Sequence, residues 1–273
     1  MGDHAHSKGM TWVQDMMKEA IPGLYTYSIQ IGKTADEDIL HGFIGNMWDQ
    51  IDDAFHQIMS DPVLSVADSI SILTFSQGGQ LARGLVEVYG HRLPAIHAMV
   101  TFGGQHQGVS DVPNCVDADA EFCHLVADLI DKGAYLPGVR ENVIQAQYLM
   151  DMGDWSGFLE YSFISYINNM GPAKNQTFKD NLMAVGTFVA ILWEQDTVVV
   201  PRISEHFGRY VDASLNATLS MQETPLYKED WIGIKAMYES SPPSLVFLQT
   251  PGNHMTINQT YFVNDIVMNY FAH

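Results

Sequence analysis

The sequence predicts an α/β fold with a mainly parallel sheet in a single domain of 273 residues. Short apolar runs of strand length alternate with helical patterns along the chain, as expected where helices connect parallel strands. Hydrophobic residues make up 47% of the chain, which is enough for one sizeable core. One apolar run also leads through a glycine-rich turn directly into a helical pattern, a unit that belongs to such a sheet.

Five segments have the length and composition of strands: Leu24–Ile31, Ser69–Leu73, Ala95–Phe102, Phe188–Trp193 and Ser244–Gln249. Apolar residues spaced three and four apart predict one long amphipathic helix from Leu40 to Ile58, ending before Asp61-Pro62. Between 113 and 179 no strand is evident. Helical patterns such as Glu121–Ile130 and Glu141–Met150 dominate that region instead.

The turn Thr74–Gly79 is the most informative stretch of the chain. An apolar strand precedes Ser76 and a helical pattern, Gln80–Val88, follows it, which is the context of a nucleophile elbow. The usual elbow pattern is G-x-S-x-G, whereas Thr74 occupies the first glycine position here. We therefore expect a slightly strained turn. The alternative is an ordinary strand–turn–helix junction with an incidental serine.

A nucleophilic serine needs a base, and the base needs an acid that orients it. Asp196 follows the strand ending at Trp193, and His254 lies in the turn-rich loop after the last strand. The chain order Ser, Asp, His is that of serine hydrolases with this kind of elbow. Each residue alone has an ordinary explanation, as a turn residue or a polar surface residue. Ser76, Asp196 and His254 together predict a catalytic triad.

Two further motifs extend this pattern beyond the triad. They are Phe102–Val109, which reads Gly-Gly-Gln-His-Gln-Gly at its centre, and Leu219–Tyr227. With the Ser-Gln-Gly-Gly-Gln turn, they resemble the palmitoyl-protein thioesterases, and the similarity runs over nearly the whole chain. The resemblance implies an α/β-hydrolase fold, a mainly parallel sheet flanked by helices. The region at roughly 113–179 then becomes a helical insertion over the active site.

The resemblance also implies an activity and a site. The family removes long fatty acyl groups from protein cysteine thioesters in the lysosome, without a cofactor. It assigns the nucleophile, acid and base to Ser76, Asp196 and His254. The backbone N–H groups of Gln77 and Met1 become the oxyanion hole. Gln105 and His106 are expected to shape the wall of the site, since His106 precedes Asp196 and does not fit the base of this fold.

The start of the chain matches the end of a loop in that family. Met1-Gly2-Asp3 resembles the last residues of its His-Gly-Met-Gly-Asp loop. The resemblance therefore implies that the signal peptide and the first core strand are missing from this sequence. If Met1 carries a free terminal amine, that oxyanion donor would be mostly charged at acidic pH, which predicts weak activity for the chain as given.

Cysteines and glycosylation signals fit a secreted or lysosomal protein. Cys115 and Cys123 would close a short disulfide loop in an oxidising compartment, and the resemblance supports that pairing. Two unpaired thiols in a cytosolic protein are the alternative. Three N-x-Thr sequons occur, at Asn175, Asn216 and Asn258.

The composition limits the classes of molecule that the protein is expected to bind. A formal net charge of −19 argues against nucleic acid and anionic membranes, and no apolar stretch has the length of a membrane span. His4 and His6 are a weak metal signal, so we expect no metal. The expected substrates are S-acylated proteins and long-chain acyl thioesters. Two alternatives stay open: a lipase or carboxylesterase acting on oxygen esters, and an inactive hydrolase-like protein that binds acyl chains.

Overall fold

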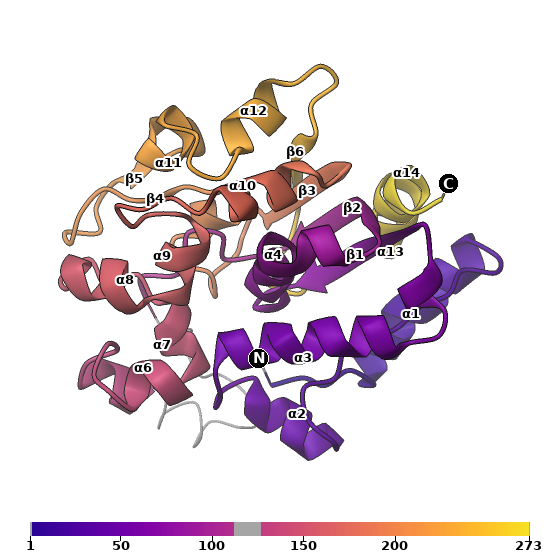
Figure 1. The fold of residues 1–273 in the computed structure, drawn as a ribbon, viewed down its shortest axis with the longest axis horizontal. Coiled ribbons are helices and arrows are strands. Elements are labelled where there is room, and N and C mark those ends of the chain that lie inside the picture. Colours follow the sequence, from indigo (N-terminus) through magenta and orange to yellow (C-terminus); the bar gives the residue numbers. More distant parts are fainter. Residues whose placement is uncertain (1, 112–126, 273) are drawn as a thin grey trace.

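The computed structural model describes residues 2–111 and 127–272, and a parallel four-stranded sheet forms its centre (Figure 1). The strand order is β1-β2-β3-β6, with every neighbouring pair parallel. The four strands are β1 (Ser69–Phe75), β2 (Ala95–Phe102), β3 (Thr187–Trp193) and β6 (Leu245–Thr250). Their carboxyl ends therefore meet at one edge of the sheet, where ligands bind in open α/β sheets. The predicted fold class is confirmed.

Helices surround this sheet and fill most of the connections between its strands. The α-helices are α1 (Lys8–Ala20), α2 (Ala35–His41), α3 (Met47–Ser60), α4 (Gly78–Tyr89), α6 (Val139–Asn142), α7 (Ile144–Tyr148), α8 (Trp155–Tyr161), α9 (Phe163–Ile167), α10 (Gln176–Met183), α11 (Pro225–Lys228), α12 (Ile234–Glu239), α13 (Gln259–Tyr261) and α14 (Met268–Tyr270). Short 3₁₀ segments are η1 (Leu64–Val66), η2 (Gly90–Arg92), η3 (Arg202–His206) and η4 (Met221–Glu223), and a π-helical turn is η5 (Phe262–Val267).

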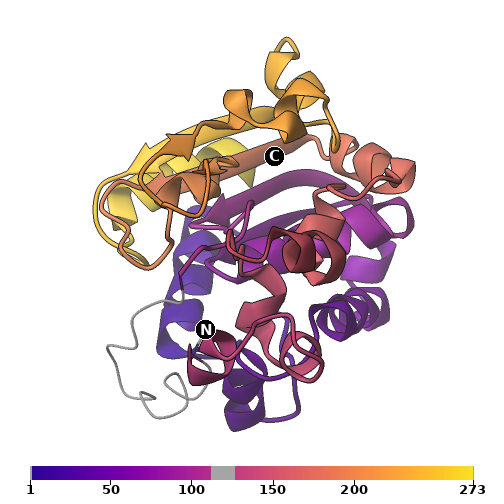
Figure 2. The ribbon, with the colours of Figure 1, turned by 90° about the vertical axis from the view of Figure 1, so that its left-hand side faces the viewer.

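The sheet has a hydrophobic core on each face, because successive strand residues point to opposite sides. Phe188 and Ala190 of β3 join the core under α3, α4 and α10. Val189 and Ile191 join a second core with α1 and η5. Figures 1 and 2 show α3 and α4 on one side of the strands and α1 with the C-terminal helices on the other. The central strands are therefore buried on both faces and read as continuous apolar runs.

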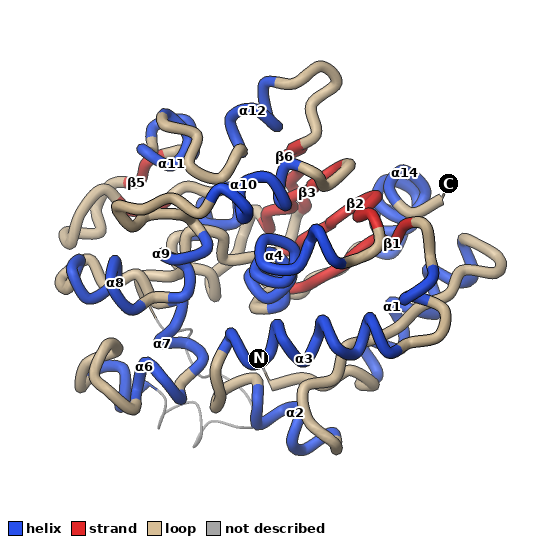
Figure 3. The backbone as a smooth tube through the Cα atoms, viewed as in Figure 1, coloured by secondary structure: helices blue, strands red, loops and turns tan. Residues whose placement is uncertain are grey.

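The prediction of a strand at Leu24–Ile31 was wrong. This segment is extended but pairs with no strand, and Figure 3 draws it as loop. One side chain of α3 binds its backbone instead: Gln57 donates to the carbonyl of Gln30 at 2.8 Å and accepts from the N–H of Gln30 at 3.2 Å. An alternating side-chain pattern indicates an extended backbone, but it does not show that the backbone pairs with a neighbouring strand.

The long helix predicted from Leu40 to Ile58 is two helices, and its predicted start was wrong. α2 ends at His41 and α3 begins at Met47. Gly45 between them has a φ of +143°, which a helix does not tolerate, and the Asn46 side chain caps α3 by accepting from the N–H of Trp48 at 2.9 Å. Ile44 continues the apolar spacing because the loop between the two helices packs against the core, whereas Leu40 at the end of α2 is exposed.

The described residues from 127 to 179 form helices, with no named strand among them. α7 to α9 lie near one another, and α10 packs along α4 beside the sheet (Figure 1). Part of the predicted helical pattern Glu121–Ile130 lies outside the described residues. A two-stranded antiparallel ribbon, β4 (Arg209–Tyr210) with β5 (Thr218–Leu219), was not predicted. Two residues per strand are too few for a periodic pattern.

Candidate active site

Ser76 lies in a sharp turn between β1 and α4. Its φ is +52°, in the left-handed region that residues other than glycine rarely adopt. The Ser76 N–H donates to the carbonyl of Phe102 on the neighbouring strand at 2.8 Å, which anchors the turn. α4 starts two residues later, at Gly78. The serine hydroxyl therefore stands at a helix N-terminus, where partial positive charge favours a developing anion.

Glycines let the elbow approach the loop after β2. A Cβ on Gly79 would come within 2.6 Å of the Cα of Gly104, so neither motif tolerates a side chain at this contact. A Cβ on Gly78 would lie 3.3 Å from the Cβ of Thr74. The absence of a side chain at Gly78 thus leaves the room that Thr74 requires. This explains how the turn forms without the usual first glycine.

The structure brings the three predicted triad residues together at the carboxyl ends of β1, β3 and β6. Ser76 Oγ lies 2.8 Å from His254 Nε2, and His254 Nδ1 lies 2.5 Å from Asp196 Oδ2. Ser76 is 8% exposed and Asp196 6% exposed. This arrangement can transfer a proton from the serine to the imidazole while the carboxylate holds the other ring nitrogen.

Asp196 is held as a carboxylate despite its burial. Burial raises the pKa of this carboxyl, but the hydrogen bond and charge of His254 and the N–H groups of Val199 and Val198 lower it further, so the pKa falls below its usual value. Those two N–H groups donate to Asp196 Oδ1 at 2.9 and 2.7 Å. Asp196 therefore stays ionised in mildly acidic conditions.

The loops that carry Asp196 and His254 are joined by Asn253, which sequence reasoning missed. Its Oδ1 accepts from the N–H groups of His254, at 2.7 Å, and Thr197, at 3.0 Å. Trp193 supports the base from another side, with its ring 5.1 Å from the imidazole of His254 in an edge-to-face contact. An Asn just before the base was the available signal, because Asn side chains commonly bond to nearby backbone groups in turns.

The two residues predicted for the site wall occupy different environments. Gln105 reaches the site, and its Nε2 donates to Ser76 Oγ at 3.3 Å. His106 is fully buried below the loop, 3.0 Å from Thr101 Oγ1 and stacked on Phe207. Burial holds the pKa of His106 well below 6.5, so this imidazole is neutral.

The other predicted residues are placed as follows. Gln77 is the N-cap of α4, and its side chain accepts from Tyr148 Oη at 3.1 Å and Gln145 Nε2 at 3.4 Å. The sequon residues Asn216 and Asn258 are exposed, and Asn175 is half-buried at the start of α10. Met1, Cys115 and Cys123 lie outside the described residues. The predicted oxyanion donor Met1 and the predicted disulfide therefore stay predictions.

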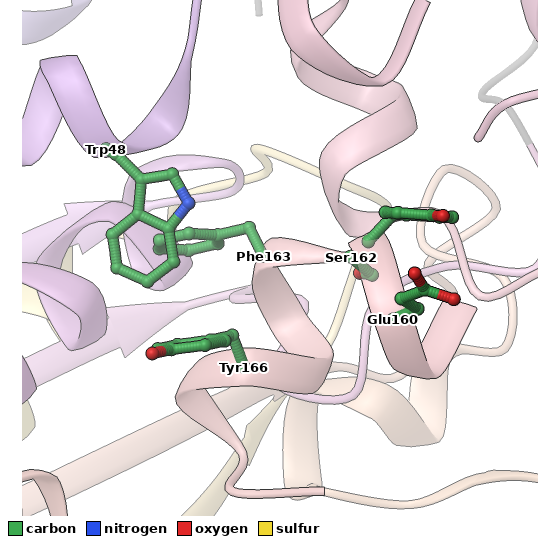
Figure 4. A pocket seen from close by; sticks show the side chains of 6 residues that line it. Trp48, Glu160, Ser162, Phe163 and Tyr166 are labelled. Atoms are coloured by element: carbon green, nitrogen blue, oxygen red, sulfur yellow. The ribbon is translucent and has the colours of Figure 1, made fainter. Parts of the chain in front are cut away.

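An aromatic cleft of about 370 Å³ opens beside α9 (Figure 4). Its lining combines α3 with the end of α8 and α9: Trp48, Glu160, Tyr161, Ser162, Phe163 and Tyr166. None of the triad residues lines this cleft, so its geometry does not link it to the reacting serine. Within the described part of the chain, no group of three or more His, Cys, Asp or Glu side chains is arranged to hold a metal ion, and no helix is long and apolar enough to cross a membrane.

Comparisons with known proteins identify the family to which the chain belongs. The palmitoyl protein thioesterase family model matches residues 1–254. Palmitoyl-protein thioesterase 1 of Caenorhabditis elegans is 38% identical over 260 residues, covering 95% of this chain and 85% of that protein. Palmitoyl-protein thioesterase 3 of Dictyostelium discoideum is 27% identical, covering 90% and 80%. A lysosomal thioesterase PPT2 homolog of Drosophila melanogaster is 28% identical, covering 77% and 69%. The chain therefore belongs to the palmitoyl-protein thioesterase family of thioester hydrolases.

Proposed function

We propose that this protein hydrolyses long-chain fatty acyl thioesters of protein cysteines through an acyl-enzyme on Ser76. The observation that carries the proposal is the chain of contacts from Ser76 Oγ through His254 to Asp196, in a member of this family. The order and spacing of these groups suit nucleophilic catalysis by a serine.

The reaction proceeds in two halves. His254 Nε2 takes the Ser76 proton as Oγ attacks the thioester carbonyl carbon, the C–S bond breaks, and the cysteine sulfur leaves with a proton. In the second half His254 takes a proton from water, the hydroxide attacks the acyl-enzyme, and the fatty acid is released as Ser76 regains its proton. Asp196 keeps the Nδ1–H tautomer of His254 and stabilises the imidazolium formed in each half.

The carbonyl oxygen becomes negative in both halves and needs hydrogen-bond donors. The N–H of Gln77, at the N-terminus of α4, is one donor in this proposal, and the dipole of α4 adds to its effect. Met1 is the second donor in the proposal, on the family resemblance alone. Tyr148 and Gln145 restrain the Gln77 side chain and so help to keep this peptide in place.

A rate comparison tests the proposal. Palmitoyl-CoA and a matching palmitoyl oxygen ester are offered to the full-length protein at about pH 5 and about pH 7, with Ser76→Ala as the control. We expect thioester hydrolysis, labelling by a fluorophosphonate probe, and loss of both in Ser76→Ala. Faster cleavage of the oxygen ester would favour a lipase or carboxylesterase. An unlabelled wild type that still binds palmitate would identify an inactive, acyl-binding protein.

We further propose that the protein works in the lysosome as a glycoprotein. The lysosomal naming of a relative and the lowered pKa of Asp196 support an acidic compartment. The exposure of Asn216 and Asn258 supports glycan attachment. Expression in a secretory host followed by N-glycosidase treatment should lower the apparent mass, and Asn216→Gln with Asn258→Gln should remove most of that change. An unchanged mass in the wild type would exclude glycosylation.

A further inference from the structure

Glu205 is a buried acid beneath the loop that carries Asp196. It lies in η3 and has no exposed surface. Its Oε2 accepts from the N–H of Trp193, the last residue of β3, at 3.0 Å. Its Oε1 is buried and has no hydrogen-bond donor among the described residues. A carboxylate with one unpaired oxygen in the interior is costly, so this group requires an explanation.

The neighbour of Glu205 is the Asp196 carboxyl, whose negative charge acts on Glu205 and raises its pKa. Asp196 has its own donors, the N–H groups of Val198 and Val199 on Oδ1 and His254 on Oδ2. Two adjacent buried carboxyls do not both ionise, and the proton stays on the one with fewer donors. That carboxyl is Glu205, since burial and the charge of Asp196 raise its pKa to about 10.

The other charged and titratable groups near Glu205 do not change this assignment. Arg202 only partly offsets the effect of burial on Glu205. His206 faces the sheet, with Nε2 at 3.1 Å from the carbonyl of Ala190 and 3.0 Å from that of Leu248. Burial lowers the pKa of His206, which disfavours a positive charge on this ring near Glu205.

We infer that Glu205 is a positioning residue for the triad: it keeps its proton, donates that proton in a hydrogen bond to the Asp196 carboxylate, and so holds Asp196 against His254. This inference rests on the proposed function of the triad. A neutral donor withdraws charge from Asp196 and makes His254 less basic, so more of the imidazole is free to act as a base in acidic solution.

Two substitutions separate the roles of charge, hydrogen bonding and packing. In Glu205→Gln the amide can still donate to Asp196 and accept from Trp193. We expect kcat within about threefold of wild type and an unchanged acid limb in the pH profile of kcat/KM. Glu205→Leu removes the donor; we expect kcat to fall about tenfold or more at similar KM, and the acid limb to move to higher pH.

A second buried acid provides the matched control. Glu87 has no exposed surface and pairs with Arg83 at 2.7 Å, and it does not contact the triad. Glu87→Gln should change the thermal midpoint and leave the acid limb in place. An acid limb that moves to lower pH in Glu205→Gln would mean that Glu205 is ionised. A folded Glu205→Leu enzyme with wild-type kcat and pH profile would mean a merely structural role. Either result overturns the inference.

An infrared measurement tests the protonation of Glu205 without any turnover. The difference spectrum between wild type and Glu205→Gln at about pH 8 should contain the C=O band of a protonated carboxyl, as the raised pKa requires. A spectrum without this band rejects the inference even if Glu205→Leu fails to fold. The band combined with an inactive wild type, or with a fully active Ser76→Ala, would instead reject the proposed function.

Discussion

Gln105 is a second side-chain partner of the Ser76 hydroxyl, besides His254. Its Nε2 donates to Ser76 Oγ at 3.3 Å and to the carbonyl of Gly103 at 3.2 Å, and its Oε1 accepts from Gln80 Nε2 at 2.6 Å. Because Gln105 supplies a donor, the Ser76 hydroxyl is left to donate to His254. We expect Gln105→Leu to lower kcat about threefold to tenfold, which corresponds to the free energy of one hydrogen bond. Steady-state kinetics on palmitoyl-CoA checks this.

Gln107 is the control for that substitution. It lies in the same loop and is also buried, but its side chain makes no hydrogen bond to Ser76. Gln107→Leu should alter stability and leave kcat near wild type. Equal losses of kcat in both variants would show that the loop fold matters and the Gln105 hydrogen bond does not.

At the level of single residues, the sequence predicted those site residues that chain order and position after a strand can identify. Ser76, Asp196 and His254 each follow a recognisable strand, and parallel strand ends converge. Glu205 had no such signal, because a lone acid in a short 3₁₀ segment has the same sequence pattern whether it faces solvent or the core. Its neighbour Asp196 is nine residues away along the chain, and only the folded structure brings the two together.

Among the elements, the contact of α4 with the loop after β2 leaves no room for a side chain. Gly79 of α4 and Gly104 approach so closely that a Cβ on Gly79 would lie 2.6 Å from backbone. Gly79→Ala should push the elbow from that loop, lower the thermal stability by roughly 1–3 kcal/mol and reduce activity further than stability explains. Thermal unfolding and single-point activity at a temperature where the variant is folded check both effects.

Gly171→Ala is the control for Gly79→Ala. A Cβ there meets nothing within 4 Å, and its φ is not in the left-handed region. We expect stability and activity near wild type, since the change mainly restricts the unfolded chain. A loss in Gly171→Ala as large as in Gly79→Ala would contradict the explanation by close packing.

Elements were predicted well where burial produces a recognisable pattern of apolar residues. They were predicted poorly where strand pairing or helix capping determines the structure. The central strands β2 and β3 are largely apolar because most of their residues are buried, so their runs were visible. Leu24–Ile31 has the alternating pattern of a strand, yet its backbone bonds to Gln57 of α3 in place of a strand. The break between α2 and α3 depends on Gly45 and Asn46, whose effects outweigh an uninterrupted apolar spacing.

Over the whole molecule, the contributions of buried titratable groups to folding stability change in opposite directions with pH. The raised pKa of Glu205 means that its stabilising contribution is complete below the unfolded pKa of about 4.3 and is lost as pH rises toward about 10. His106 and His206 have lowered pKa values, so their contributions are present above about pH 6.5 and are lost as pH falls. The stability of the wild type alone therefore does not isolate any one of these groups.

A difference between two proteins does isolate Glu205. In the unfolded chain Glu205 ionises above about pH 4.3, whereas the folded chain must keep it protonated, so wild type loses about 1.4 kcal/mol per pH unit that Glu205→Gln does not lose. The histidine contributions are common to both proteins and cancel. Urea unfolding between about pH 5.5 and about pH 8 should give a free-energy difference that grows steadily in favour of Glu205→Gln. A difference that stays constant over this range would mean that folding leaves the protonation of Glu205 unchanged, and the buried carboxyl pair would then carry two charges.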